Sequence, residues 1–188
     1  MLSTNNTVQT STGNIGIGTA TPGYKLDVVG TINTSNLRLP NLIPTNTIVV
    51  TILGSTGTNP RGVVADTQGN IYTANNVSNT LSKISPSGVT TTFGSTIVNP
   101  DGMAIDTLGN IYTTSHTSNN VVKTTPAGAS TIMGTTGSTP HGITIDSVGN
   151  AYTANYYSNS VSKITPAGVS TVLGSTGVNP RGIVLDAS

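Results

Sequence analysis

A 40-residue repeat constrains the fold of this chain more than any other feature of its sequence. Pro60, Pro100, Pro140 and Pro180 are spaced 40 residues apart. A glycine two positions after each proline and an aspartate four positions after that glycine keep the same spacing. A fixed period of this length indicates one supersecondary unit stacked on copies of itself. The repeat therefore excludes most single-site enzyme folds.

Turn signals divide each repeat into four short strands. In the first copy, Asp-x-x-Gly-Asn separates a strand at 62–66 from one at 70–75, because the aspartate can accept backbone N–H groups while glycine takes the left-handed conformation. Ser78-Asn79 and Pro86-x-Gly88 mark the turns before a third strand at 80–85 and a fourth at 89–93. Four antiparallel strands per repeat form the blade of a β-propeller, so we expect an all-β fold.

Apolar patterns order the strands within a blade. The first strand reads VVAD, MAID, ITID and IVLD in its four copies, which predicts burial on both faces and the innermost position. The fourth strand alternates apolar and polar residues and is expected to be outermost. Leu81 and Ile84 in the third strand are three positions apart, which suggests a β-bulge.

The number of blades is incomplete for a closed ring. Residues 46–54 align with a fourth strand, three complete blades follow, and residues 182–186 supply one more first strand. Closed propellers generally have four to eight blades. We expect either that the natural chain continues after Ser188, which we favour, or that subunits complete one another.

The motif Pro-x-Gly-Ile-x-x-Asp-x-x-Gly-Asn-Ile-Tyr, followed by Lys-Ile-x-Pro-x-Gly, resembles the NHL-repeat and streptogramin-lyase-like propellers over residues 46–188. The streptogramin-lyase resemblance implies a metal-assisted elimination that uses histidine and glutamate on one rim of the propeller. This chain has no glutamate, which argues against that activity.

The segment before the repeat carries a second resemblance. Short period-two runs around Ile15 and Ile17, and around Leu26 and Val28, predict strands joined by tight turns. The pattern GIGT, Pro, KLDV and Gly within residues 13–34 resembles the β-module of phage tail fibres, which implies a homotrimeric stem. We expect a flexible terminus at 1–12, this module and a proline-rich connection at 13–44, and propeller blades at 45–188.

Composition limits the partners. Charged residues make up 7% of the chain against about 25% in ordinary soluble domains, and the net charge is +1 without a basic cluster. Nucleic acid is therefore excluded as a partner, and no apolar run is long enough for a membrane-spanning helix. The uncharged polar composition is typical of proteins on a virion surface or in the extracellular space. No cofactor is expected.

Variation between copies indicates the recognition surface. The residue between Pro and Gly is Arg61, Asp101, His141 or Arg181, and the turn after the second strand carries Asn76-Val77, His116-Thr117 or Tyr156-Tyr157. Antiparallel order places both positions on one rim. We expect ligand binding there by Arg61, His116, His141, Tyr156, Tyr157 and Arg181. Drift of exposed loops without function is the alternative.

Residues that recur in every copy have structural explanations. The aspartates at 66, 106, 146 and 186 are expected to cap turns rather than to ring a cation. The lysines at 83, 123 and 163 should lie along strands, and the tyrosines at 72, 112 and 152 should fill the gaps between blades. His116 and His141 lack a third ligand from glutamate or cysteine, so neither a metal site nor a catalytic residue is expected.

These observations favour a non-enzymatic structural and adhesive protein of a virion fibre or cell-surface appendage. The stem would be trimeric, and the propeller head would bind a host surface glycan or protein. The alternatives are an extracellular propeller lyase and a structural scaffold without a ligand.

Overall fold

The computed structural model describes residues 8–11, 14–17, 26–28, 52–94 and 97–186, which belong to two units, Met1–Val49 and Val50–Ser188. The predicted proline-rich connection and its boundary near residue 44 lie outside the described residues. Within the described part of the chain, no helix has the length and apolarity needed to cross a lipid bilayer.

The first unit contains a three-stranded sheet in the order β1-β2-β3, formed by Val8–Ser11, Asn14–Ile17 and Leu26–Val28. Strands β2 and β3 lie where the sequence predicts them. Two expectations differ from the structure: β1 lies inside the segment expected to be flexible, and β2 pairs with β3 in parallel. A tight turn cannot join parallel strands, so only β1 and β2, which are antiparallel, fit the predicted connection.

The second unit contains three four-stranded antiparallel sheets, one per repeat, each with its strands in sequence order. The predicted four-strand parse of the repeat is confirmed. The first sheet comprises β4 (Pro60–Ala65), β5 (Ile71–Asn75), β6 (Thr80–Ile84) and β7 (Thr90–Thr92); the second comprises β8 (Pro100–Ile105), β9 (Ile111–Ser115), β10 (Asn120–Thr124) and β11 (Ser130–Thr135); the third comprises β12 (Pro140–Ile145), β13 (Ala151–Asn155), β14 (Ser160–Ile164) and β15 (Ser170–Ser175).

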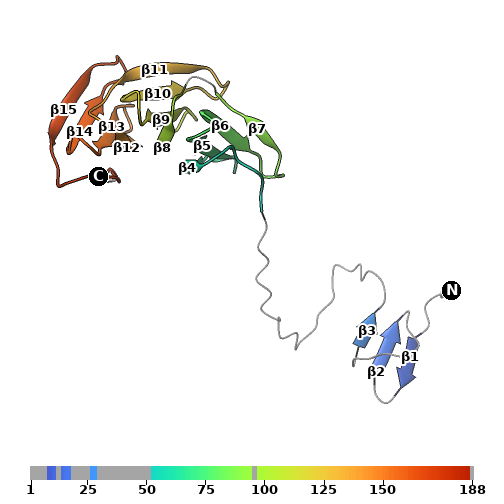
Figure 1. The fold of residues 1–188 in the computed structure, drawn as a ribbon. Coiled ribbons are helices and arrows are strands. Elements are labelled where there is room, and N and C mark those ends of the chain that lie inside the picture. The colour runs from blue at the N-terminus through green and yellow to red at the C-terminus, as the bar shows by residue number, and fades with distance from the viewer. Residues whose placement is uncertain (1–7, 12–13, 18–25, 29–51, 95–96, 187–188) are drawn as a thin grey trace. The chain divides into compact units, whose positions relative to one another are not determined.

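The sheets are arranged around an arc, as propeller blades are. Figure 1 shows β4, β8 and β12 on the inner side of the arc and β7, β11 and β15 on the outer side, which confirms the predicted strand order. The inner strands approach one another closely. A Cβ atom added at Gly102 would collide with the backbone oxygen of His141 in the next blade, and one at Gly62 would collide with that of Asp101. The repeated glycine therefore permits contact between the backbones of adjacent inner strands.

The predicted burial of the inner strands is wrong. Residues of β8, which has a blade on each side, are mostly half-buried, whereas all of β9 is buried. Figure 1 shows the inner strands facing the axis of the arc, where propellers have a central channel, so one side of these strands stays partly exposed. Residues 182–186 were expected to form a further first strand, but they have no strand structure, although a Cβ atom added at Gly142 of β12 would collide with the backbone oxygen of Arg181.

The hydrophobic core lies between neighbouring blades. One buried cluster joins Tyr72 and Leu81 of the first blade to Ile111 and Val122 of the second. Another cluster joins Tyr112 to residues of the third blade. The prediction that tyrosines fill the gaps is confirmed for Tyr72 and Tyr112, whose rings also lie 5.4 Å from the Nζ atoms of Lys83 and Lys123, respectively.

The Asp-x-x-Gly-Asn turn forms as predicted in all three blades. Asp106 Oδ1 accepts hydrogen bonds from the backbone N–H groups of Leu108 and Asn110, at 3.0 and 2.8 Å. Its Oδ2 accepts from the Asn110 amide and the Tyr112 hydroxyl, at 2.8 and 3.0 Å. Gly109 has a φ of 79°, the left-handed conformation that the turn requires. The capping explanation for these aspartates is therefore confirmed.

Each blade contains irregular pairings that the sequence indicates only in part. The predicted third-strand bulge between Leu81 and Ile84 is wrong, because β6 pairs with both of its neighbours without a register shift. In the second and third blades the extra residue belongs instead to the fourth strand, as Met133 of β11 and Leu173 of β15. A register shift also follows the first proline of every blade, for example between Pro140 and Ile143, and this shift is not evident from the sequence.

Candidate functional site

The site is a hollow of about 480 Å³ on the rim where the inner strands begin, and it belongs to three consecutive blades and the segment that follows them. The residues that line it are Arg61, Asp101, His116, Thr139, His141, Tyr156, Tyr157 and Arg181. All six residues predicted to bind a ligand are thus brought together. Binding itself stays a prediction.

Register shifts bring the first group of residues into the hollow. Asp101 and His141 each stand between the proline and the glycine of an inner strand, within the interval where the ladder to the second strand is interrupted. Such a bulge changes the direction of the side chain it carries. The same backbone feature in every blade therefore presents one variable side chain to the hollow.

Backbone hydrogen bonds bring in the second group of residues. The N–H of His116 donates to the carbonyl of Asn99 at 3.0 Å, and the N–H of Tyr156 donates to that of Thr139 at 2.9 Å. Asn99 and Thr139 directly precede the prolines of the inner strands. These bonds hold the turn after the second strand beside the start of the first strand, so the rim predicted from antiparallel order is formed.

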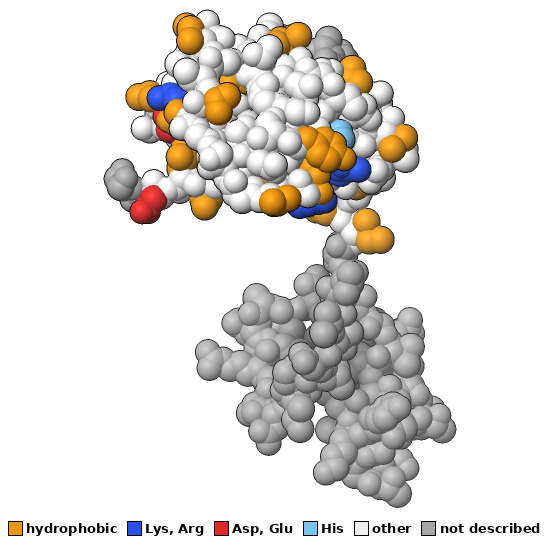
Figure 2. All heavy atoms as spheres, turned by 60° about the vertical axis from the view of Figure 1, so that its left-hand side comes forward, with side chains coloured by type: hydrophobic (Ala, Val, Ile, Leu, Met, Phe, Trp, Pro, Cys, Tyr) orange, Lys and Arg blue, Asp and Glu red, His pale blue; other side chains and the backbone are white. Residues whose placement is uncertain are grey.

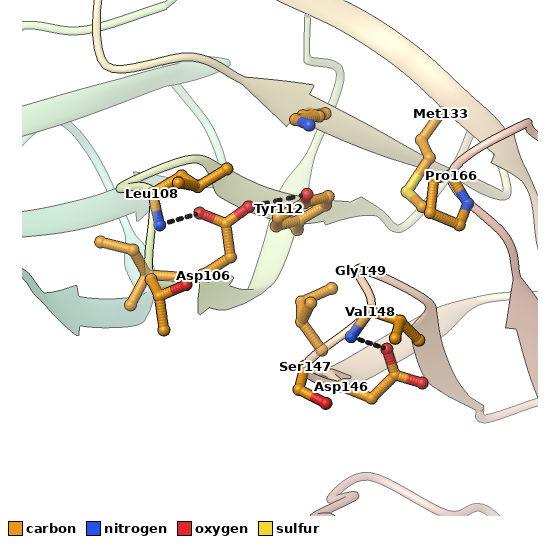
Figure 3. Close-up of a pocket in the computed structure, with 13 residues that line it drawn as sticks. Asp106, Leu108, Tyr112, Met133, Asp146, Ser147, Val148, Gly149 and Pro166 are labelled. Atoms are coloured by element: carbon orange, nitrogen blue, oxygen red, sulfur yellow. Dashed lines mark hydrogen bonds between the residues drawn. The ribbon is translucent and has the colours of Figure 1, made fainter.

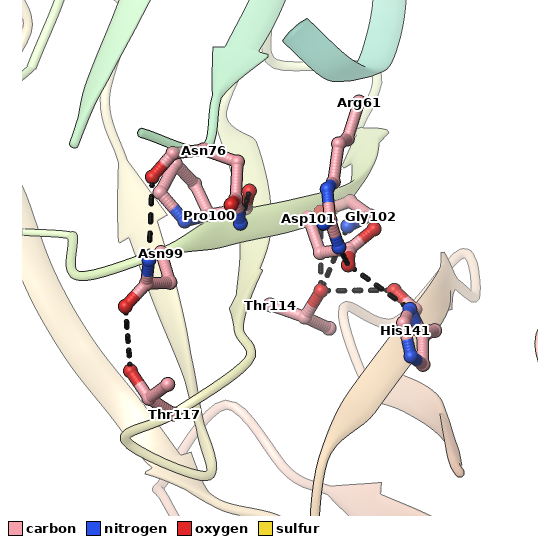
Figure 4. Close-up of polar contacts among 9 residues, drawn as sticks. All are labelled: Arg61, Asn76, Asn99, Pro100, Asp101, Gly102, Thr114, Thr117 and His141. Atoms are coloured by element: carbon pink, nitrogen blue, oxygen red, sulfur yellow. Dashed lines mark hydrogen bonds and ion pairs between the residues drawn. The ribbon is translucent and has the colours of Figure 1, made fainter. Parts of the chain in front are cut away.

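Asp101 is the centre of the polar contacts in the hollow (Figure 4). Its Oδ2 atom lies 3.0 Å from an Arg61 guanidinium nitrogen and 2.9 Å from Nδ1 of His141. The side chains of Asp101 and His141 are only 13% and 11% exposed, respectively, so solvent screens their interaction weakly. Burial lowers the pKa of His141 below its ordinary value, with Arg181 and His116 acting in the same direction, although Asp101 opposes this shift.

A row of aromatic rings continues from this cluster to the surface. His116, His141, Tyr156 and Tyr157 follow one another with ring centroids 5.0 to 5.1 Å apart and tilted edge contacts. The Arg181 guanidinium lies 4.8 Å from the centre of the Tyr156 ring. Figure 2 shows one face of the repeat unit, on which charged side chains are sparse. The hollow is thus a local concentration of charged and aromatic groups.

Three potential metal ligands converge in the hollow, which the sequence analysis did not anticipate. One ligand atom each from Asp101, His116 and His141 lies within 4.8 Å of the other two. The absence of a metal site was inferred from the lack of glutamate and cysteine, and Asp101 was overlooked as the third ligand. Its position in the repeat, the same as that of His141, is the signal that could have identified it.

A second hollow, of about 410 Å³, lies between the second and third blades (Figure 3). Its lining includes Asp106, Tyr112, Lys123, Met133 and Asp146. Both aspartates are engaged in capping their own turns, and Asp146 Oδ1 accepts the backbone N–H of Val148 at 3.1 Å. These groups have structural partners, so the hollow does not present converging reactive side chains.

The chain resembles known propellers in sequence and in structure. The family described as SBBP, Beta-propeller repeat, matches residues 88–121. No curated protein matches in sequence. Among solved structures, virginiamycin B lyase from Staphylococcus aureus is 20% identical with a TM-score of 0.59, over 68% of this chain and 46% of the lyase. A chain of a nidogen/laminin complex is 21% identical with a TM-score of 0.62, over 70% of this chain and 54% of that chain.

A gluconolactonase from Xanthomonas campestris is 11% identical with a TM-score of 0.58, over 68% of this chain and 50% of the enzyme. This chain thus spans about half the length of the solved proteins it matches. The expectation of a non-enzymatic protein is wrong on this comparison, because similar propellers include a lyase and a lactonase. The propeller fold is shown, whereas the tail-fibre resemblance of the N-terminal module stays a prediction.

Proposed function

We propose that this chain forms part of a divalent-metal-dependent propeller enzyme of the lyase or lactonase type, which acts on an ester or lactone in the rim hollow. The observation that carries the proposal is the convergence of Asp101, His116 and His141. Similar folds in a lyase and a lactonase support it. In this proposal, Asp101 supplies the carboxylate that the streptogramin-lyase resemblance would assign to a glutamate, which this chain lacks.

The donor set fits a divalent transition metal. Two imidazole nitrogens and one carboxylate oxygen suit Zn²⁺, Mn²⁺ or Fe²⁺ and leave positions for water or substrate. A metal ligand must be deprotonated, and the lowered pKa of His141 favours its neutral form. Arg61 orients the carboxylate of Asp101 through the contact of 3.0 Å.

When bound, such an ion would polarise a carbonyl oxygen of the substrate. The chain's own residues would bind the substrate and orient the metal ligands. Tyr156 packs against the edge of His141 and restricts the rotation of its ring. Tyr157, 69% exposed, offers an aromatic surface at the opening of the hollow. The half-buried position of Asp101 and His141 limits access of water to the reacting end.

Isothermal titration calorimetry with Zn²⁺, Mn²⁺ and Mg²⁺, followed by assays on a panel of lactones and cyclic depsipeptides, tests this function. We expect metal-stimulated turnover that falls at least 100-fold in His141→Ala and Asp101→Asn. Asp66→Asn, which changes a carboxylate in a turn outside the hollow, should retain activity. Equal activity of the His141 variant, or no metal-dependent turnover of any substrate, would refute the proposal.

A second candidate is attachment to a host surface glycan, and the aromatic row that ends at Tyr157 favours it. On this hypothesis, the chain belongs to a virion or extracellular appendage whose N-terminal module forms a homotrimer. Tyr156→Ala together with Tyr157→Ala should abolish retention on a glycan array while the unfolding temperature stays within a few degrees. Unchanged retention would remove this candidate.

A further inference from the structure

The two arginines of the hollow differ in their partners. Arg61 and Arg181 occupy the same position of the repeat, in the first blade and in the segment after the third. Arg61 makes an ion pair with Asp101. Arg181 makes no ion pair with any residue that the structure describes, and its guanidinium lies instead over the ring of Tyr156. A positive charge without an acidic partner among the described residues therefore lines the hollow.

The charge balance of the lining favours an anion. Its residues include two guanidinium groups and one carboxylate, so with neutral imidazoles the formal charge is +2 − 1 = +1. A divalent ion held by Asp101, His116 and His141 would add two further positive charges. Because Asp101 already contacts Arg61 and His141, the uncompensated charge is that of Arg181. The electrostatic field of Arg181 also reaches His141 and acts to lower its pKa.

The Arg181 guanidinium lies over the Tyr156 ring, 4.8 Å from its centre. A planar guanidinium that lies on an aromatic ring keeps its N–H groups directed outward in its own plane. Parallel N–H donors match the two oxygens of a carboxylate or of a phosphate. Tyr156 also contacts His141, so the anion position and the candidate metal ligands are two residue contacts apart.

We propose that the substrate of the hollow carries an oxyanion group, a carboxylate or a phosphate, that is bound by Arg181 on the Tyr156 ring. The inference rests on the proposed function, since it names the class of substrate that the site takes. Arg61 acts differently from Arg181, because it orients Asp101. The two arginines at the same repeat position thus have separate roles, one in positioning a ligand residue and the other in binding substrate.

Histidine NMR tests the inference directly, because the chain contains two histidines and both line the hollow. The full chain, free of metal and in a buffer of low ionic strength, is titrated with inorganic phosphate and separately with propionate. We expect a saturable shift of the His141 ring signals with at least one probe. The apparent Kd should rise at least 10-fold in Arg181→Gln. Saturation by only one of the two probes distinguishes phosphate from carboxylate.

Lys163→Gln is the matched control, because it removes one positive charge from a lysine that lies over Tyr152 and does not line the hollow. It should bind the probe as the wild type does. Tyr156→Leu, which removes the stacking surface, should weaken binding as Arg181→Gln does. Equal weakening in Lys163→Gln, unchanged binding in Arg181→Gln, or absence of a saturable shift would overturn the inference.

The outcome is separable from that of the enzyme proposal. His116→Ala should lose metal binding but still bind the anion, as read from the remaining histidine. Anion binding in a protein that takes up no metal would refute the enzyme and leave the anion site. Metal-dependent turnover of uncharged lactones without any anion binding would refute the anion site alone.

Discussion

The hydroxyl of Thr114 donates a hydrogen bond of 2.9 Å to the backbone carbonyl of His141 in the next blade. The Thr114 hydroxyl oxygen also accepts a hydrogen bond of 2.9 Å from the backbone N–H of Gly102. Thr114 therefore connects two adjacent inner strands beside the hollow (Figure 4). The corresponding residues of the other blades are Ala74 and Ala154, and the blade geometry therefore does not require this threonine. We infer that it positions the backbone of His141.

Thr114→Ala should therefore fold normally and bind metal less tightly. Loss of groups that orient metal ligands typically costs about 10- to 100-fold in affinity. We expect the dissociation constant for the metal to rise about 10-fold. Calorimetry with Zn²⁺ or Mn²⁺ gives the affinity, and circular dichroism checks the fold. Thr131→Ala, at an exposed position of the outer strand β11 that does not line the hollow, is the control. An unchanged dissociation constant in Thr114→Ala would show that His141 needs no such support.

Asp106→Ala should destabilise the propeller by about 2 kcal/mol, because it removes charge-assisted hydrogen bonds to two backbone N–H groups and two side chains. Burial of the carboxylate raises its pKa, but these hydrogen bonds outweigh burial and lower the pKa of Asp106 below 3.8. The aspartate thus stabilises the fold above its unfolded-state pKa, and this stability is lost as the pH falls through the lower folded-state pKa. Urea unfolding between pH 6 and pH 2 should show a smaller acid loss for Asp106→Ala than for wild type. Parallel curves would contradict the prediction.

A buried threonine hydroxyl has a partner in two blades and none in the middle one. Thr73 donates to Asn75 at 3.1 Å, and Thr153 donates to Asn155 at 2.9 Å. Ser115 replaces that asparagine in the middle blade, and the buried Thr113 hydroxyl has no hydrogen-bond partner in the described structure. A buried unsatisfied polar group costs about 1 to 3 kcal/mol.

Thr113→Val should therefore raise the free energy of unfolding by about 1 kcal/mol, whereas Thr73→Val should lower it by a similar amount. The two substitutions are identical in chemistry and differ only in the partner, so each controls for the other. Equilibrium unfolding in urea measures both. The same sign for both changes would argue against the hydrogen-bond explanation.

Thr139 has a φ of 56°, in the left-handed region that a β-branched residue rarely adopts. The equivalent residues of the other repeats are Asn59, Asn99 and Asn179, and asparagine tolerates this conformation. We expect Thr139→Asn to stabilise the chain by about 1 kcal/mol, since left-handed non-glycine residues store about 1 to 3 kcal/mol. Differential scanning calorimetry measures the change, and the reverse substitution Asn99→Thr should destabilise. A lower melting temperature of Thr139→Asn would contradict this account.

The periodic sequence predicted the blades well because every turn has local chemistry that one repeat contains in full. The Asp-x-x-Gly-Asn turn is an example, since Asp106 finds all its partners within six residues. Burial of the inner strands was predicted incorrectly because these strands line the axis of the arc, and β8 is mostly half-buried although it has a blade on each side. Local pattern thus determined the strands, but an apolar strand pattern did not show that the inner strands face the axis of the arc and are therefore only half-buried.

The sequence predicted which residues line the candidate site, but it did not predict that three of them converge as potential metal ligands. Differences between copies identified the six rim residues, because the blade geometry does not require a particular residue at positions that vary within a fixed repeat. Contact between Asp101 and His141 depends on a bulge and on the close approach of inner strands, and neither follows from residue types alone. No metal site was predicted because the chain has no glutamate or cysteine that could serve as a third ligand, although Asp101 supplies the carboxylate instead.

The bulge after each inner-strand proline has an evolutionary consequence. Every repeat delivers a single side chain from an equivalent backbone position, so one codon change can exchange an acid for a base or an imidazole without altering the scaffold. Duplication or deletion of a repeat would insert or remove one such group and leave its neighbours intact. A propeller of this kind can therefore acquire new reactivity one repeat at a time.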